Sequence, residues 1–324
     1  MIAVRRKFNM CALFGFVNYK HLINSKELKK LVNTLAVESE VRGTDASGIA
    51  YVKNQSVKIL KRAKPAHNMR FYFPTGITAL IGHTRMTTQG NEKFNYNNHP
   101  FEGKTAEGNF ALCHNGVLYN DMQLKKSEKL PDTVIETDSY VAVQLIEKSG
   151  RLDFDSIKNV SESVEGSFVF TMLDSKQRLY ISKGDNPIYL IHFRQLGLYV
   201  YASTEKIMKS ALKKTILGRF SYEVIKVSEG EIISIDRSGR LKRAGFDYQD
   251  NCSFFRYCGI YDKSYESNDL YSICNMFGIT QEELKLLYEI GYTDDDIEIL
   301  IEDRVLLADC IKEAREYSEA YGEC

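Results

Sequence analysis

The stretch Cys11-Ala12-Leu13-Phe14-Gly15-Phe16-Val17 is continuously apolar, which predicts a short buried strand. A helix is expected next, over residues 25–40, because apolar side chains recur there at helical spacing. These side chains are Leu28, Leu31, Val32 and Leu35. The fold therefore begins with a strand that must be covered by an amphipathic helix.

Similar apolar runs recur along the chain to about residue 235, with turn residues between several of them. They predict strands at 49–52, 78–82, 110–113, 167–173, 179–182, 188–193, 198–202 and 231–235. Helical patterns are found at 137–148, 152–163 and 205–213. Strands interspersed with helices indicate the α+β class, with two sheets and helices outside them.

Charge divides the chain of 324 residues into two parts. Residues 251–324 contain 17 acidic and 6 basic side chains, a net charge of −11, whereas residues 1–250 carry +11. The expected division is a segment 1–10, a body 11–250 and an acidic helical domain 251–324. In that domain we expect helices at 268–277, 280–290, 294–302 and 305–321, with N-caps at Thr280 and Thr293.

Composition narrows the class of protein. The seven cysteines include no CxxC pair, which favours free thiols in the cytoplasm over a disulfide framework or a metal site. No apolar run approaches the length of a membrane helix, and the acidic tail argues against nucleic acid and anionic membranes as partners. We also find no nucleotide-binding motif and expect no cofactor.

Four short motifs occur in a fixed order along the chain. They are Met10-Cys11-Ala12-Leu13-Phe14-Gly15, Arg42-Gly43-Thr44-Asp45-Ala46-Ser47-Gly48, Gly82-His83-Thr84-Arg85-Met86-Thr87-Thr88-Gln89-Gly90 and His114-Asn115-Gly116-Val117-Leu118-Tyr119-Asn120. Together they resemble the class II glutamine amidotransferases over about residues 11–245. The resemblance implies a four-layer αββα sandwich of the N-terminal nucleophile hydrolase type, followed by a small helical domain.

The resemblance assigns a role to each motif. Cys11 would be the nucleophile that attacks the side-chain amide of glutamine and releases ammonia. Asn115 and Gly116 would stabilise the oxyanion, although Asn-Gly is also typical of a hairpin turn. Arg85 and Asp138 would bind the α-carboxylate and α-amino group of glutamine. The remaining implied residues are Thr88 and His99 in the pocket, and Arg42, Gly43, Asp45 and His114 behind it.

In this family the base is the α-amino group of the nucleophile, so Cys11 has to be the first residue of the mature chain. Residues 1–10 are therefore expected to be a leader or a misassigned start. Three residues depart from the family pattern without removing a reacting group. Ala12 replaces a glycine, Met86 an aromatic residue and Gln89 a frequent histidine.

Three functions stay open at this point. The first is a glutaminase that supplies ammonia to a separate acceptor enzyme, because the acidic tail is too short for a synthase domain. The second is a stand-alone hydrolase of γ-glutamyl amides or peptides. The third is a binding protein in which Cys11 is permanently blocked. The tail could serve a partner enzyme or self-association.

Overall fold

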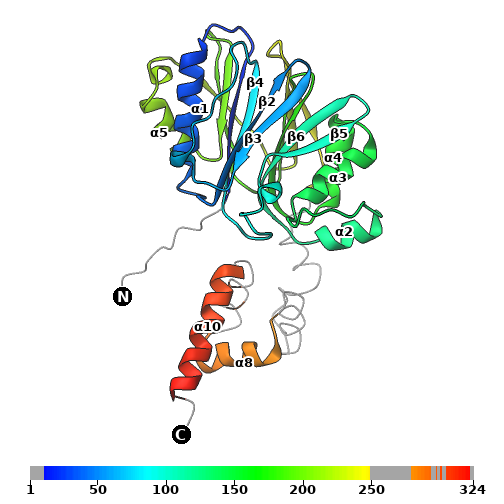
Figure 1. Cartoon of the computed structure of the whole chain (residues 1–324), viewed down its shortest axis with the longest axis vertical. Coiled ribbons are helices and arrows are strands. Elements are labelled where there is room, and N and C mark those ends of the chain that lie inside the picture. Colours follow the sequence, from blue (N-terminus) through cyan, green and yellow to red (C-terminus); the bar gives the residue numbers. More distant parts are fainter. Residues whose placement is uncertain (1–10, 249–278, 293–296, 298–299, 301–303, 322–324) are drawn as a thin grey trace. The chain divides into compact units, whose positions relative to one another are not determined.

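The computed structural model describes residues 11–248, 279–292, 297, 300 and 304–321. The chain divides into two compact units, one of residues 1–251 and a second of residues 252–324. The first unit contains two antiparallel sheets (Figure 1).

The seven-stranded sheet has the order β11-β9-β10-β1-β4-β2-β3, and its pairs are antiparallel. Strand β1 lies at its centre, where Ala12 pairs with Thr84 of β4 and Phe14 pairs with Ala202 of β10. Its strands are β1 (Ala12–Asn18), β2 (Ala46–Lys53), β3 (Ser56–Arg62), β4 (Ala79–Arg85), β9 (Tyr189–Phe193), β10 (Leu198–Ala202) and β11 (Glu223–Ile225).

The six-stranded sheet has the order β13-β12-β8-β7-β6-β5. The long pairing of β6 with β7 places Asn115 opposite Val169 and Gly116 opposite Phe168. Its strands are β5 (Phe101–Thr105), β6 (Gly108–Leu118), β7 (Gly166–Asp174), β8 (Leu179–Lys183), β12 (Glu231–Ile235) and β13 (Leu241–Gly245).

Three apolar clusters give this unit its layers. On β1, Phe14 and Phe16 pack with α1 (Ser25–Ser39) and α5 (Glu205–Lys213). Leu13 and Val17 point the other way, into a cluster shared by the two sheets, because side chains alternate along a strand. A third cluster joins the second sheet to α3 (Tyr140–Ser149) and α4 (Phe154–Ser163), so the order is helices, sheet, sheet, helices (Figure 1).

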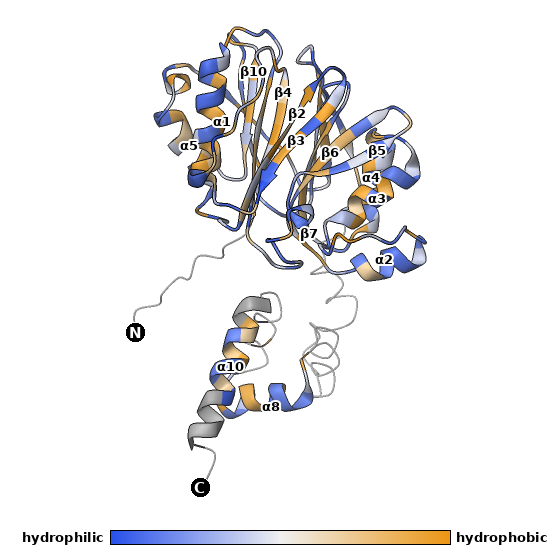
Figure 2. Cartoon of the chain, in the orientation of Figure 1, coloured by the Kyte–Doolittle hydropathy of each residue, from blue (hydrophilic) through white to orange (hydrophobic). Residues whose placement is uncertain are grey.

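The hydropathy of each element follows these layers. The inner strands are largely apolar, whereas α1 alternates apolar and polar residues around its circumference (Figure 2). Side chains also fix where helices begin: Asn24 accepts a hydrogen bond from the N–H of Glu27, and Thr204 accepts one from Ile207. Shorter elements complete the unit, namely α2 (Asp121–Ser127), η1 (Ala66–Asn68), η2 (Asn95–Asn97) and η3 (Ile216–Arg219).

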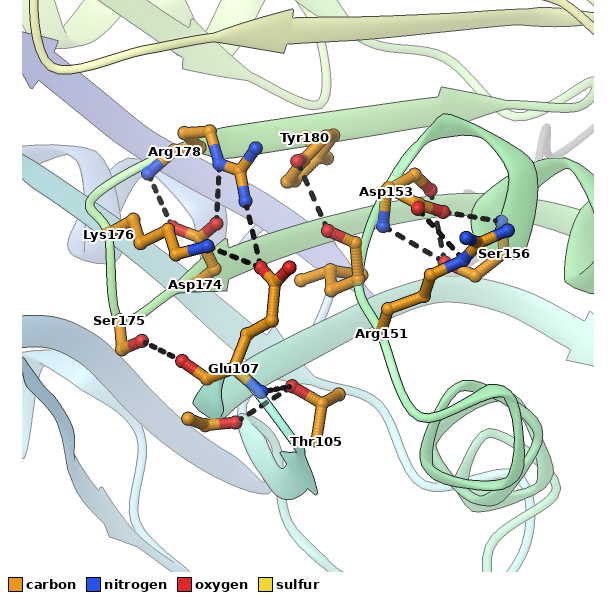
Figure 3. Close-up of polar contacts among 12 residues, drawn as sticks. Thr105, Glu107, Arg151, Asp153, Ser156, Asp174, Ser175, Lys176, Arg178 and Tyr180 are labelled. Atoms are coloured by element: carbon orange, nitrogen blue, oxygen red, sulfur yellow. Dashed lines mark hydrogen bonds and ion pairs between the residues drawn. The ribbon is translucent and has the colours of Figure 1, made fainter.

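A charged cluster joins two hairpins at one end of the six-stranded sheet (Figure 3). Glu107, between β5 and β6, lies 2.5 Å from Lys176 Nζ and 3.6 Å from Arg178 Nη2. The Nε of Arg178 also donates to Asp174 at 2.7 Å. The pairs of Glu107 are exposed and contribute little stability individually, whereas Asp174 is buried. We interpret the cluster as positioning the two turns.

The second unit has its own small core. Helices α8 (Gln281–Glu289) and α10 (Arg304–Tyr321) contribute Leu284, Leu287 and Leu307 to it. The capping box is present, since Thr280 Oγ1 accepts from the N–H of Glu283 and the Glu283 carboxylate accepts from the N–H of Thr280. The helices expected at 268–277 and 294–302, the N-cap at Thr293 and the segment 1–10 lie outside the described residues.

Side-chain periodicity predicts the interior strands of the two sheets better than their edge strands. The α+β class, the nine expected strands and the helices in the body are confirmed, with bounds that differ by a few residues. The pattern missed α2 and four strands, β3, β5, β11 and β13. All four missed strands are edges of the two sheets, where one side has no partner strand and the sequence is more polar. Among the described residues, no helix is long and apolar enough to cross a membrane.

A substitution at Gly82 tests how closely the central sheet packs. A Cβ added to Gly82 would lie 2.2 Å from Cε2 of Phe14, which is fully buried and cannot move aside. We expect Gly82→Ala to lower the free energy of unfolding by about 1–3 kcal/mol, the usual range for overpacking. Urea denaturation measures this change.

The matched control is Gly245→Ala, because a Cβ there comes no closer than 3.8 Å to a neighbouring heavy atom. Equal unfolding midpoints for the two variants would contradict the predicted packing at Phe14.

Candidate active site

Cys11 lies one residue before β1, next to the end of β4. Its Sγ accepts a hydrogen bond from the N–H of Met86 at 3.4 Å, and Arg42 Nε donates to its carbonyl oxygen at 2.8 Å. Gly43 makes this approach feasible, since a Cβ there would be 2.4 Å from the carbonyl carbon of Arg85. Three motifs that are distant in sequence therefore meet at the thiol.

The environment of Cys11 favours the protonated thiol over the thiolate. Desolvation raises its pKa to about 11, while the N–H of Met86 and the charge of Arg85 act in the opposite direction. Only a thiolate is an effective nucleophile, so Cys11 needs a base beside it. With Met10 attached, the nitrogen of Cys11 is an amide and cannot serve as that base.

Arg85 ends β4 and is buried, which lowers its pKa, while the negative charges of Asp138 and Asp45 raise it. Its Nη1 donates to Asn98 Oδ1 at 2.7 Å, and its Nη2 donates to the carbonyls of Gln89 and Gly90 at 2.5 and 2.9 Å. A guanidinium can bind a carboxylate at two points through either of two pairs of N–H groups, and both pairs include Nη2. A carboxylate would therefore bind the remaining N–H groups or replace one of these carbonyls.

Asp45 ties the segment after β4 to the first motifs. Its backbone N–H donates to the carbonyl of Arg85 at 3.0 Å, and its Oδ2 accepts from the N–H of Thr87 at 2.7 Å. The two bonds fix the backbone on both sides of Met86, whose N–H faces the thiol. Thr88, the residue after Thr87, is exposed and makes no hydrogen bond to another described residue.

The loop between β4 and β5 is anchored to the segment that carries Asp138. Gln89 Nε2 donates to the carbonyl of Glu136 at 3.0 Å. Asn97 makes two further bonds to Glu136, donating to its carboxylate at 2.7 Å and accepting from its backbone N–H at 2.9 Å. This anchoring places Asp138 within electrostatic range of Arg85 and Cys11.

Asp138 and His114 belong to one buried chain of hydrogen bonds. The carboxylate of Asp138 accepts from the N–H of Leu118 at 2.7 Å and from Ser139 Oγ at 3.3 Å. Ser139 Oγ also lies 2.8 Å from Nδ1 of His114. Burial lowers the pKa of His114, and the charge of Asp138 raises it. The chain holds Asp138 against the end of β6 that carries Asn115.

Asn115 is fully buried, and neither its Oδ1 nor its Nδ2 has a hydrogen-bond partner among the described residues. Buried amides are nearly always paired, so this one is available to a group outside the protein. Asn115 and Gly116 lie inside β6 rather than at a chain reversal, so the hairpin-turn interpretation is wrong. Gly116 has a φ of +145°, and a Cβ there would be 1.8 Å from the carbonyl oxygen of Ser167, which excludes other residues.

His99 lies in a cluster of neutral histidines. Its ring stacks on His83 with centroids 4.1 Å apart, and neither ring nitrogen of His99 has a partner among the described residues. Burial sets the pKa of His99 well below its usual value and lowers the pKa of His83 to about 3. His83 Nε2 donates to the carbonyl of His114 at 2.9 Å. A protonated His99 would therefore be strongly disfavoured, which argues against an acid role.

Three asparagine or serine residues of the site were missed from sequence. Asn98 orients Arg85, Ser139 links Asp138 to His114, and Asn186 donates to the carbonyl of Asn115 at 3.2 Å and to Ser167 Oγ at 2.9 Å. Asn98 and Ser139 adjoin motif residues, which is a usable signal. Asn186 is distant in sequence from all four motifs, and no sequence pattern indicated its role. The described residues include no cluster of three His, Cys, Asp or Glu side chains that could bind a metal ion.

Solved structures share the fold of this chain. The fold resembles that of the glutamine phosphoribosylpyrophosphate amidotransferase of B. subtilis, with a TM-score of 0.57 and 20% identity over 74% of this chain and 50% of that chain. A second solved structure, an allosteric regulatory enzyme of purine biosynthesis, gives a TM-score of 0.58 and 22% identity, with 74% and 50% covered. At these levels of identity, what the two structures share with this chain is the fold.

Sequence comparison identifies the domain itself. Residues 83–210 match the family described as "Glutamine amidotransferase domain". Glutamine--fructose-6-phosphate aminotransferase of Staphylococcus aureus is 30% identical over 246 residues, covering 72% of this chain and 38% of its own length. The Staphylococcus epidermidis enzyme is 33% identical over 189 residues, covering 55% and 30%. This chain contains a class II glutamine amidotransferase domain and spans about a third of the length of these relatives.

The raised pKa of Cys11 predicts an unusual pH profile for alkylation of the full chain. With a pKa of about 11, the rate of reaction with iodoacetamide should keep rising about tenfold per pH unit through pH 10. A thiol with an ordinary pKa of about 8.5, such as N-acetylcysteine, levels off above about pH 9. Peptide mass spectrometry measures the modification at Cys11, and a plateau below pH 9 would show that the site is better solvated than its geometry indicates.

Proposed function

We propose that this chain hydrolyses the side-chain amide of glutamine to glutamate and ammonia through a thioester on Cys11. One pair of observations carries the proposal. The thiol of Cys11 accepts a hydrogen bond from the N–H of Met86 within electrostatic range of Arg85, and the same unit contains a fully buried amide, Asn115, that has no partner among the described residues. The first is the expected setting of a nucleophile, and the second that of an oxyanion donor.

The reaction begins once the α-amino group of Cys11 is free. That amine takes the thiol proton, and Sγ attacks the carboxamide carbon of glutamine. In the tetrahedral intermediate, the oxyanion accepts hydrogen bonds from Asn115 Nδ2 and the N–H of Gly116. The C–N bond then breaks, the ammonium proton passes to the leaving nitrogen, and ammonia departs. Water hydrolyses the resulting thioester to glutamate and regenerates the thiol.

Substrate selection follows from two opposite charges within electrostatic range of the thiol. Arg85 would bind the α-carboxylate through N–H groups that the loop carbonyls leave available, while Asp138 would bind the α-ammonium group. A carboxylate offers about four lone-pair positions, so Asp138 can accept an ammonium in addition to its bonds from Leu118 and Ser139. In this proposal His99 covers the pocket as a neutral ring, and Thr88 contacts glutamine from the exposed loop.

We further propose that the ammonia serves a separate acceptor enzyme. The staphylococcal relatives are named for an aminotransferase reaction on fructose 6-phosphate, and this chain matches only about a third of their length. The acidic unit of residues 252–324, whose sequence is distinct from the body in charge, is the proposed docking element for that enzyme. A cytoplasmic location fits such a role.

The amine of Cys11 is the first group to test. A chain that begins at Met10, and from which methionine is removed, should release ammonia from glutamine and react with 6-diazo-5-oxonorleucine at Cys11. The chain that retains residues 1–10 should be inactive, because an amide nitrogen accepts no proton. A coupled glutamate assay and intact mass measure the two properties.

Cys11→Ser in the processed chain is the control for background glutaminase activity. Equal activity of processed and unprocessed chains would rule out the α-amine mechanism. Inactivity of both, in a folded protein, would favour a binding function instead.

The amide of Asn115 is the second group to test. Asn115→Ala should lower kcat by a factor of about 100 to 1,000 and leave KM nearly unchanged, because an oxyanion donor acts mainly in the transition state. Asn159→Ala, a substitution of the same type on helix α4, is the control for general effects on folding. A raised KM at constant kcat would place Asn115 in substrate binding instead.

A further inference from the structure

Lys61 places a positive charge at the inner face of an edge strand. It lies on β3, on the face that carries Val57 and Ile59, and these two side chains pack in the apolar cluster shared by the two sheets. Its Nζ is 5.0 Å from the ring centroid of Phe101, the first residue of β5. A cation in such surroundings needs a hydrogen-bond partner of its own.

The partner of Lys61 is the loop between β4 and β5. The Nζ of Lys61 donates to the backbone carbonyl of Asn98, and the carbonyl of Lys61 accepts from Asn95 Nδ2 at 3.1 Å. Gly48 pairs with Lys61 on the neighbouring strand, and a Cβ there would lie 2.3 Å from the carbonyl oxygen of His99. The loop therefore packs directly against β2 and β3 at this point.

The charge of Lys61 lies within electrostatic range of the candidate active site. Desolvation lowers the pKa of Lys61 to about 8, and the positive charge of Arg85 lowers it as well, whereas Cys113 and Glu102 act in the opposite direction. Lys61 is therefore mostly protonated at pH 7, and its bond to the Asn98 carbonyl is charge-assisted.

Asn98 connects Lys61 to Arg85. It is fully buried, and its N–H donates to the carbonyl of Asn95 at 3.3 Å while its Nδ2 donates to that of Glu92 at 2.7 Å. Both of these bonds stay within the loop and set its shape. The Oδ1 of Asn98 accepts from Arg85 Nη1 at 2.7 Å. The bond from Lys61 therefore sets where Asn98 lies relative to the sheet that carries Arg85.

We propose that Lys61 is a positioning residue for the carboxylate-binding site. It holds the Asn98 carbonyl against β3, Asn98 holds Nη1 of Arg85, and the direction of the guanidinium is thereby fixed before glutamine binds. An arginine ordered in advance binds its ligand at a lower entropic cost. The inference rests on the proposed function, because it takes Arg85 as the group that binds the α-carboxylate. Lys61 then affects substrate affinity, while the bond-breaking steps at Cys11 do not depend on it.

Lys61→Met tests this role, because methionine keeps most of the apolar length of the side chain and removes its charge and donors. Isothermal titration measures glutamine binding in the chain processed to residue 11 and carrying Cys11→Ser, in which no thioester forms. Lys61→Met should raise the Kd for glutamine at least about tenfold at pH 7. In the processed chain with Cys11 intact, it should raise KM by a similar factor and change kcat less than about threefold.

Lys58→Met is the matched control. Lys58 is an exposed lysine of the same strand, with no hydrogen bond to another described residue, so its substitution should leave Kd and KM unchanged. Iodoacetamide has no carboxylate, and its rate of reaction with Cys11 should be equal in the two variants and the unsubstituted chain. Circular dichroism checks folding, and if Lys61→Met does not fold, Lys61→Gln removes the charge with a shorter polar side chain and takes its place.

The outcomes separate this inference from the proposed function. If glutamine is hydrolysed and folded Lys61→Met keeps the Kd and KM of the unsubstituted chain, only the role of Lys61 is overturned. An equal loss of kcat and of iodoacetamide reactivity in Lys61→Met would also overturn it, because general distortion of the site would explain both. Glutamine binding that depends on Lys61, without hydrolysis by the unsubstituted chain, supports this role and contradicts the proposed glutaminase. If the unsubstituted chain does not bind glutamine, both are overturned.

Discussion

The antiparallel pairing of β1 with β4 is the constraint on which the candidate active site depends. Because Ala12 pairs with Thr84, the residue before β1 comes to lie beside the residues that end β4. Cys11 then meets the N–H of Met86, and the missing side chain of Gly43 lets Arg42 reach the cysteine carbonyl. A shift of one residue in this register would turn every side chain of β1 to the opposite face and separate these groups.

Around that pairing, polar groups fall into two kinds. Most are paired: Arg85 is held by Asn98 and two loop carbonyls, and Asp138 by Leu118 and Ser139. Asn115 is buried to the same degree but has no partner among the described residues. Pairing makes the scaffold rigid, whereas an unpaired buried amide destabilises the unliganded fold and is compensated when a ligand binds.

Local sequence patterns were sufficient to predict the interior strands and insufficient to predict the edge strands of the two sheets. Buried strands such as β1 and β10 are apolar enough to be recognised from single runs of residues. The edge strand β3, Ser-Val-Lys-Ile-Leu-Lys-Arg, mixes charged and apolar residues without a regular period and can be mistaken for a loop. Asn115-Gly116 shows the opposite difficulty, since a dipeptide typical of turns lies within the longest strand of its sheet.

The sequence by itself determined the α+β class, the order of the interior strands and of the longer helices, and the identity of the motif residues, because these depend on side-chain periodicity and on short local patterns. Tertiary structure alone decided which of these groups are free to react or to bind a ligand. Only packing shows that the thiol of Cys11 is desolvated and that Nη2 of Arg85 is already engaged by Gln89 and Gly90. Asn186 likewise supports Asn115 across 71 residues of sequence. Burial and hydrogen bonding depend on neighbours brought together by the two sheets, and a linear pattern does not encode those neighbours.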